Sequence, residues 1–362
     1  MPTLSLPAEV TKSPLRPVTG PGSFPATPAS DNSPASKLLA KLRCPRCQGA
    51  FSSAVNGQAA HPGATASSGE LPDLVCHPCG ITAQQVHRSG AENVQIRCGG
   101  FTTSDVKTDW LNQVKESAKR VLGPRYQLAI DQISPVYTGF LNRRINRFLA
   151  SFDLQREFVA DLGSGPLRHD PRIICCDGMN YENVNLVTDL QQLPLAANSL
   201  DGVISVAVLE HVTHPQAHVA EMLRVLRPGG RVLCFIPFLQ GYHASPYDYQ
   251  RFTISGMRQL FADFQITSVE PAAGPTSALV WIMQEWLAMV LSLGIRPLYK
   301  LLMPLTYVLS PLKYLDVLLR HHPAAANIDS GFVIEASKPR VEEASPTLSA
   351  PGGKAPLAGP HF

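Results

Sequence analysis

The chain has 362 residues, of which 44% are hydrophobic and 16% charged, which is enough for two domains with a substantial core. Its net charge of +3 excludes a protein that is basic over its whole surface, although a local basic patch remains compatible with it. No apolar run follows a basic start at the N-terminus, so we expect no secretory signal peptide.

Both ends of the chain are rich in Pro, Ser, Thr and Ala and lack hydrophobic periodicity. This composition is typical of disordered segments, which we expect over residues 1–36 and 339–362.

Two CxxC pairs follow the first tail. Cys44 and Cys47 lie in LRCPRCQGAF, and Cys76 and Cys79 lie in LVCHPCGITAQQV. Each spacing favours a tight turn with two thiolates on one metal, and two such turns supply the four sulfurs that zinc prefers. A redox CxxC is the alternative, but no βαβ pattern surrounds either pair. We therefore predict a structural Zn²⁺ site in a small domain over residues 37–104.

Residues 105–156 are predicted to form a helical connector, in which GFLNRRINRFLASF is the second amphipathic helix. Between Gln113 and Ala150 there are seven Lys or Arg residues and two acids. This local excess suits an anionic substrate, a phospholipid surface or RNA, and it suits a solvated helix face equally well.

From about residue 157 the chain alternates apolar runs with helical stretches, which predicts an α/β fold with a doubly wound, mostly parallel sheet. The expected strands lie at FVADL, RIICC, VNLVTDL, GVISV, RVLCFIPF, QITSVEP and GFVIEASKP. The stretch RVLRPGG predicts a helix end with Arg227 in the last turn. Ligands of such sheets bind beyond the carboxyl ends of the strands.

Three acids fall at those carboxyl ends. Asp161 precedes a turn formed by Gly163, Ser164 and Gly165, Asp177 ends the second strand, and Asp189 follows the third. In this order the motifs resemble class I S-adenosylmethionine-dependent methyltransferases of the type 11 group, over about residues 155–338.

The resemblance implies S-adenosylmethionine as the cofactor. It places the glycine turn near the methionine half, Asp161 at the charged end, Asp177 on the ribose hydroxyls and Asp189 on the adenine amino group. The alternative is a turn or helix-cap role for Asp161 and a turn role for Asp177. Only PLRHDPR separates Gly165 from the second strand, so either the first helix is reduced to a turn or that strand lies elsewhere.

The cysteine-containing segment resembles the small zinc-ribbon proteins that activate tRNA and protein methyltransferases as separate subunits. Here the ribbon would be fused ahead of the methyltransferase core, which we expect over residues 157–338.

The segment after the fifth strand, PFLQGYHASPYDYQRFT, places several titratable groups in one loop at a carboxyl end. Similar HxxPxDYxRFT sequences occur in a subgroup of type 11 enzymes often encoded beside glycan-assembly genes. A hydroxyl acceptor needs a nearby base, and His243 and Asp248 are the candidates. Alternatively, Asp248 and Arg251 pair and fix the loop. Glu210 and His211, in VLEHVTHP, are expected to be scaffold residues.

An apolar insertion at about residues 276–325 separates the last two strands. Aromatic and basic residues border its apolar faces over 276–320, which suits a helix lying in a membrane interface. A lid over the active site or a dimer contact is the alternative. Gln284 and Glu285 lie near the centre of its first apolar run and argue against a membrane span.

The sequence therefore predicts a methyltransferase that modifies an oxygen on a sugar, glycan or lipid-linked acceptor. We expect it in the cytoplasm or at the inner face of a membrane. Two alternatives remain open: an RNA methyltransferase that uses the ribbon to bind nucleic acid, and a non-catalytic methyltransferase-like scaffold.

Overall fold

The computed structural model describes residues 34–55, 58–59, 73–87, 94–98, 134–136, 139–244 and 247–340. Most of both predicted tails, and residues 105–133 of the predicted connector, lie outside these ranges.

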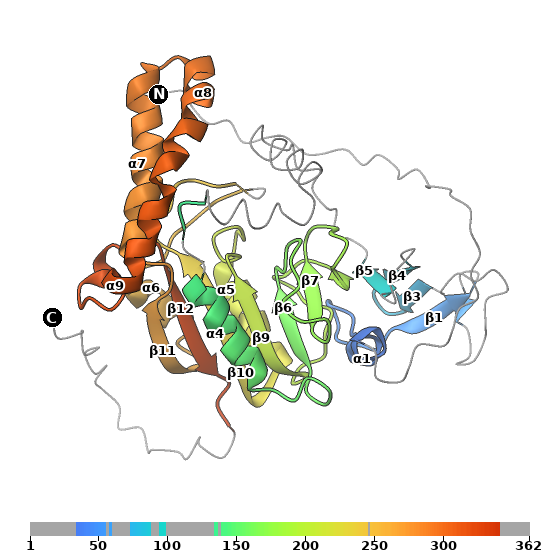
Figure 1. Cartoon of the computed structure of the whole chain (residues 1–362). Helices are drawn as coiled ribbons and strands as arrows, with labels where there is room; N and C mark the ends of the chain where they lie inside the picture. The colour runs from blue at the N-terminus through green and yellow to red at the C-terminus, as the bar shows by residue number, and fades with distance from the viewer. Residues whose placement is uncertain are drawn as a thin grey trace, which may run out of the picture.

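Twelve strands form one sheet in the order β11-β12-β10-β9-β6-β7-β8-β5-β4-β3-β1-β2 (Figure 1). Its central strands run parallel: β6 (Val159–Leu162), β7 (Ile174–Asp177), β8 (Leu186–Val187), β9 (Leu200–Val206) and β10 (Leu226–Pro237). Next to them, β12 (Gly331–Ser337) and β11 (Gln265–Pro271) pair antiparallel. All seven expected strands are present, and the mostly parallel α/β sheet is confirmed.

Helices cover both faces of this sheet. Along β10, Val232 and Cys234 belong to one buried cluster, whereas Leu233 and Phe235 belong to the other. This alternation follows from the two-residue period of a strand. The amphipathic helix α4 (Gly139–Ala150), as predicted, packs on the second cluster, and α5 (Pro215–Val225) and α6 (Ile254–Leu260) pack on the first.

The entry into β10 differs from the prediction. Helix α5 ends at Val225, so Arg227 lies in β10 and not in the last helical turn, where the basic residue is Arg224. The strand begins early because Leu226 already pairs with Leu200 before the register shifts. In this position the Arg227 guanidinium contacts Asp201.

The link between β6 and β7 is short. Its described residues 166–173 form turns and bends without a helix, so the first crossover helix is reduced to a turn. The second strand lies where RIICC predicts it, and Cys175 and Cys176 are core residues with no exposed surface.

The cysteine-containing region extends the sheet beyond β8. It comprises α1 (Pro34–Lys41), β1 (Ser52–Val55), β2 (Gln58–Ala59), β3 (Asp73–Cys76), β4 (Ile81–His87) and β5 (Val94–Cys98). Strand β5 pairs parallel with β8, joining Ile96 to Leu186. Leu38 and Ile96 are buried in the same cluster as Leu162 of β6. This region therefore shares a core with the central sheet and covers its edge.

A helical hairpin projects from the other end of the sheet (Figure 1). It comprises α7 (Pro275–Ser292), α8 (Arg296–Thr306), η1 (Tyr307–Leu315) and α9 (Asp316–Leu319), and η2 (Ala325–Asn327) leads on to β12. Among the described residues, the stretch Arg296–Leu319 has the length and apolar composition that a membrane crossing requires.

The polar residues in the centre of α7 are paired inside the hairpin. Gln284 is fully buried and donates from Nε2 to Ser310 Oγ at 2.9 Å. Tyr299 Oη donates to Glu285 Oε2 at 2.5 Å. These groups therefore join the helices of the hairpin to one another.

Asp316 fixes the start of the hairpin. Its carboxylate has no exposed surface and accepts the backbone N–H groups of Thr276 at 2.7 Å and Ser277 at 2.8 Å. A carboxylate at this position satisfies free N–H groups of the first turn of α7 and complements the helix dipole.

We expect Asp316→Asn to lower the free energy of unfolding by roughly 1 to 3 kcal/mol, because an amide places N–H donors against these buried N–H groups. Urea denaturation followed by circular dichroism measures the change. Asp263→Asn, at an exposed position, is the matched control and should leave the midpoint unchanged. Equal midpoints for the two variants would contradict this role of Asp316.

Candidate functional site

The turn after β6 brings the backbone close to the segment that follows β9. Gly163 has φ of +86°, and a Cβ at this position would lie 2.2 Å from Val208 Cγ2. Gly165 also has a positive φ of +57°, but no described atom lies within 4 Å of its would-be Cβ. The turn is thus packed on one side at Gly163 and open at Gly165, as close approach to a ligand requires.

The backbone N–H groups of this turn are bound to β7. Those of Gly163 and Ser164 donate to the Cys176 carbonyl at 2.7 and 3.2 Å, and that of Gly165 donates to Asp177 Oδ2 at 2.8 Å. These bonds fix the turn against the adjacent strand end.

Asp161 is 2% exposed, and burial, followed by the nearby charge of Asp177, raises its pKa to about 7. His169, from the short link to β7, places its Nε2 3.9 Å from Asp161 Oδ2. Burial lowers the pKa of His169, so near neutral pH its ring is uncharged. Sequence reasoning missed His169, because a histidine in a short non-periodic link carries no recognisable signal.

Asp177 and Asp189 lie at the ends of the next two strands. Asp177 Oδ1 accepts the Met179 N–H at 2.7 Å, so this carboxylate has the contacts of a turn acid as well as its bond to Gly165. Thr188 N–H donates to the Asp177 carbonyl at 3.0 Å, and Asp189 follows directly. Asp189 lines a surface pocket together with Pro45 of the cysteine-containing region. The structure therefore places Asp161, Asp177 and Asp189 on three neighbouring strand ends.

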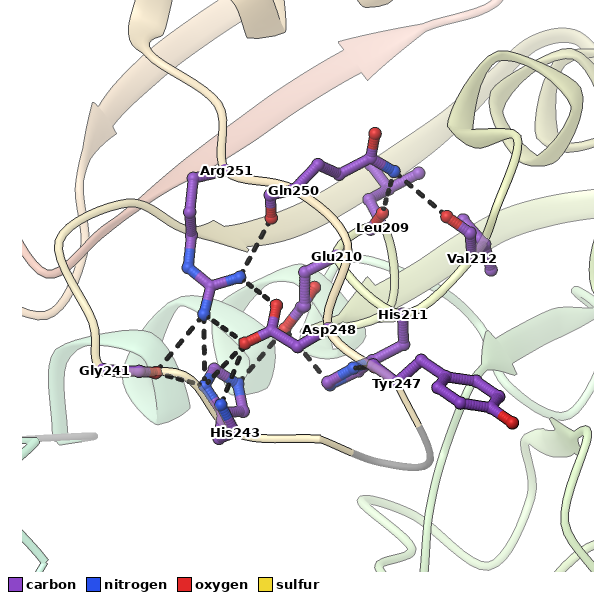
Figure 2. Close-up of polar contacts among 10 residues, drawn as sticks. All are labelled: Leu209, Glu210, His211, Val212, Gly241, His243, Tyr247, Asp248, Gln250 and Arg251. Atoms are coloured by element: carbon purple, nitrogen blue, oxygen red, sulfur yellow. Dashed lines mark hydrogen bonds and ion pairs between the residues drawn. The ribbon is translucent and has the colours of Figure 1, made fainter. Parts of the chain in front are cut away.

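A second group of side chains lies at the ends of β9 and β10 (Figure 2). Glu210 has no exposed surface, and His211 Nε2 and His243 Nε2 lie 3.6 and 3.7 Å from its Oε1. The two imidazole rings meet edge to face with centroids 5.4 Å apart. Burial acts to lower the pKa of His243, but Glu210 and the Gly241 carbonyl outweigh it and raise that pKa.

Asp248 and Arg251 form a paired unit beside His243. Arg251 Nη2 donates to Asp248 Oδ2 at 2.6 Å and Nη1 contacts Oδ1 (Figure 2). The His243 N–H also donates to Asp248 Oδ2 at 2.9 Å. Although burial opposes them, these contacts lower the pKa of Asp248. The arrangement matches the alternative in which Asp248 and Arg251 fix the loop.

The same loop is hydrogen-bonded to the segment after β9 and contacts the hairpin. Gln250 Nε2 donates to the carbonyls of Leu209 and Val212 at 2.8 and 3.0 Å (Figure 2). The ring of Trp281, from α7, lies 5.5 Å from the ring of His243. Three separate segments thus meet around His243.

The four predicted metal-binding cysteines lie together at the other end of the sheet. Their Sγ atoms all lie within 4.8 Å of one another, and Cys47 and Cys76 approach to 3.5 Å. Four sulfurs around one zinc are about 3.8 Å apart at a Zn–S distance of about 2.3 Å, so the set fits this ion. In each turn the residue after the second cysteine, Gln48 or Gly80, has a positive φ.

We expect Gly163→Ala and Gly165→Ala to differ strongly. Alanine at 163 combines a left-handed backbone with a clash at Val208, and it should lower the free energy of unfolding by roughly 2 to 4 kcal/mol. Alanine at 165 meets open space and should lower the free energy of unfolding by only about 1 kcal/mol. Urea denaturation of both variants measures this difference, and equal losses would contradict the packed geometry at Gly163.

Comparisons with known proteins give similarities to methyltransferases. A family model described as a methyltransferase domain matches residues 170–234. The malonyl-[acyl-carrier protein] O-methyltransferase of Hahella chejuensis is 34% identical over 97 residues, which are 27% of this chain and 32% of that enzyme. The ubiquinone/menaquinone biosynthesis C-methyltransferase UbiE of Saccharophagus degradans is 24% identical over 191 residues, 48% of this chain and 76% of that enzyme.

Among solved structures, phosphoethanolamine N-methyltransferase 2 of Haemonchus contortus in complex with S-adenosyl-L-methionine is 15% identical with a TM-score of 0.43, covering 68% of this chain and 63% of that one. The chain spans only about a third of the length of the Hahella relative. The family match and the doubly wound sheet identify a class I S-adenosylmethionine-dependent methyltransferase domain in this chain.

Proposed function

We propose that the protein transfers a methyl group from S-adenosylmethionine to a hydroxyl oxygen of a sugar, glycan or lipid-linked acceptor. The observation that carries this proposal is the junction of two groups of side chains at adjacent strand ends. Asp161 and the glycine turn form one group, and Glu210, His211 and His243 form the other. Val208 packs on Gly163 between them.

The first group suits the cofactor. In this proposal Asp161 faces the cationic end of the cofactor, the open side of the turn at Gly165 admits it, Asp177 accepts its ribose hydroxyls and Asp189 contacts its adenine. The Asp177 carboxylate accepts the backbone N–H groups of Gly165 and Met179 on different oxygens and has further lone pairs for a hydroxyl donor.

The second group suits the methyl acceptor. Bound S-adenosylmethionine supplies a methyl group on a positively charged sulfur. As the hydroxyl oxygen bonds to this methyl carbon, the carbon–sulfur bond breaks and the hydroxyl proton must leave. Neutral His243 is the proposed proton acceptor, whereas Asp248, paired with Arg251, holds the loop. The relative from Hahella is named as an O-methyltransferase and that from Saccharophagus as a C-methyltransferase, so the choice of oxygen rests on the candidate base His243.

The cysteine cluster is proposed to hold a structural zinc. Four cysteine ligands leave no open coordination position, so this ion would stabilise the region that pairs with β8 and would take no part in methyl transfer.

The helical hairpin is proposed to lie in a membrane interface, which would bring the enzyme to a lipid-linked acceptor. Exposed apolar residues follow helical spacing along it: Leu301, Leu305, Val308, Leu312, Leu315 and Leu319. At its base Arg143, Arg147 and Arg320 line one pocket, and such a group suits anionic headgroups.

Calorimetric titration with S-adenosylhomocysteine tests the cofactor site. Because Asp161 has a pKa of about 7 and must ionise to attract the ligand ammonium, affinity should rise about tenfold from pH 6 to pH 8. Burial lowers the pKa of His169, so its ring is uncharged near neutral pH, and the charge of Asp177 contributes to the raised pKa of Asp161. Asp161→Asn should bind weakly and without this pH dependence.

The absence of binding to the folded, zinc-loaded wild type at every pH would overturn the enzyme proposal and favour the scaffold alternative. Equal pH dependence in the wild type and Asp161→Asn would remove Asp161 from the site while leaving the cofactor proposal intact.

Sedimentation with vesicles of phosphatidylcholine and phosphatidylglycerol tests the membrane proposal. The double variant Leu305→Asp/Val308→Asp should bind at least tenfold more weakly, because burying each of these side chains contributes about 1.5 to 3 kcal/mol. Thr82→Asp adds a charge to the exposed surface of β4 and should bind as the wild type does. Equal sedimentation of all three proteins would argue for a lid or a protein contact instead.

A further inference from the structure

We propose that Glu210, His211 and His243 bind a divalent transition-metal ion at the carboxyl ends of β9 and β10. The three side chains come from two segments that the sheet order brings together. Each of the three residues offers one ligand atom, and these atoms all lie within 4.8 Å of one another.

The distances between these atoms suit a shared cation better than direct bonds. The two nitrogens lie 3.6 and 3.7 Å from Oε1, which is too long for hydrogen bonds. Ligands at about 2.1 Å from one ion are separated by about 3.0 to 3.5 Å, so each nitrogen lies within a few tenths of an ångström of the separation from Oε1 that a shared ion requires.

The protonation of both imidazoles favours metal binding. His211 Nδ1 lies 2.5 Å from the Tyr247 carbonyl, and His243 Nδ1 lies 2.9 Å from the Gly241 carbonyl (Figure 2). A carbonyl only accepts, so Nδ1 of neutral His211 carries the hydrogen and its Nε2 presents a lone pair. For His243 the contact with the Gly241 carbonyl is shorter than the 3.3 Å contact of Nδ1 with Arg251 Nη2, which favours the same tautomer. Backbone carbonyls bound to the second ring nitrogen are the usual support of a metal-binding histidine.

The Glu210 carboxylate supplies the independent observation. It has no exposed surface, and neither of its oxygens has a hydrogen-bond partner among the described residues. An isolated buried carboxylate is costly, and its free energy falls when a cation binds it. The nearby Arg251 guanidinium contacts Asp248 and His243 instead. Two ring nitrogens and a buried carboxylate thus face one point, where a cation could contact all three residues.

The ligand set indicates the class of ion. Imidazole nitrogens favour zinc and neighbouring transition metals over magnesium and calcium, and two histidines with one glutamate leave at least one coordination position open. This site therefore differs from the four-cysteine cluster, which is closed.

The role of the ion rests on the proposed methyl transfer, although the binding site does not. An acceptor hydroxyl in the open position would lose its proton to water more readily, because the cation stabilises the alkoxide. Its oxygen–carbon bond then forms as the carbon–sulfur bond breaks. With the ion bound, His243 is a ligand and the ion replaces it as the group that promotes proton loss.

The test is the metal content of the full-length protein, stripped with a chelator, reloaded with Zn²⁺ and freed of excess ion by gel filtration. We expect the wild type and His322→Ala, a change at an exposed histidine outside the cluster, to hold one zinc more per chain than His211→Ala/His243→Ala and Glu210→Gln. Equal zinc content in all four proteins would overturn the proposal.

Titration of the metal-free wild type with Co²⁺, followed by visible absorption, tests the site without any variant. A site of nitrogen and oxygen ligands should add visible absorption without the sulfur-to-cobalt charge-transfer bands of the cysteine cluster. A spectrum from tetrathiolate Co²⁺ alone, at saturation, would also overturn the proposal. Neither measurement contains the cofactor, so failure of S-adenosylhomocysteine binding and failure of metal binding are separate results.

Discussion

The packing of Gly163 against Val208 fixes the position of the group around Asp161 relative to the group around Glu210. Because a Cβ at Gly163 would lie 2.2 Å from the valine, the turn after β6 and the segment after β9 meet without a side chain between them. Asp161 lies two residues before this contact and Glu210 two residues after Val208. Ala207 reaches this position with a left-handed φ of +54°, which is uncommon for alanine and marks a constrained segment. The two buried carboxyl groups are therefore positioned by one contact between neighbouring strands.

The sequence predicted the central parallel strands well because β6, β7 and β8 are buried on both faces, so each one appears as a short, nearly continuous apolar run. Where the place of a residue depends on pairing with a strand distant in the sequence, the prediction was wrong or incomplete. Arg227 was assigned to a helix because Leu226 gives no local sign that it pairs with Leu200. The nearness of Glu210 to His243 depends on the order of β9 and β10, which no local pattern contains. The scaffold role expected for Glu210 stays a prediction.

The hairpin shows a related limit of sequence patterns. Gln284 and Glu285 interrupt an apolar run, and their polarity alone does not reveal whether they face a neighbouring helix or the outside of the hairpin. In the structure they bind Ser310 and Tyr299, so the polar groups join the helices and apolar side chains remain on the outside. Trp281 then links α7 to the loop of His243, since a Cβ at Gly241 would lie 2.5 Å from its indole nitrogen. A tilt of the hairpin would therefore also move the His243 loop at the proposed site of the methyl acceptor.

The pairing of β5 with β8 has a consequence for biosynthesis. Strand β5 ends at Cys98, whereas its partner begins only at Leu186, so the cysteine-containing region leaves the ribosome well before the strand that covers its edge. At roughly 5 to 20 residues per second, this edge stays unpaired for about 5 to 20 seconds in every nascent chain. Such an edge can pair with another chain. During this interval a bound metal, or a chaperone that covers the edge, would protect the growing chain from misassembly.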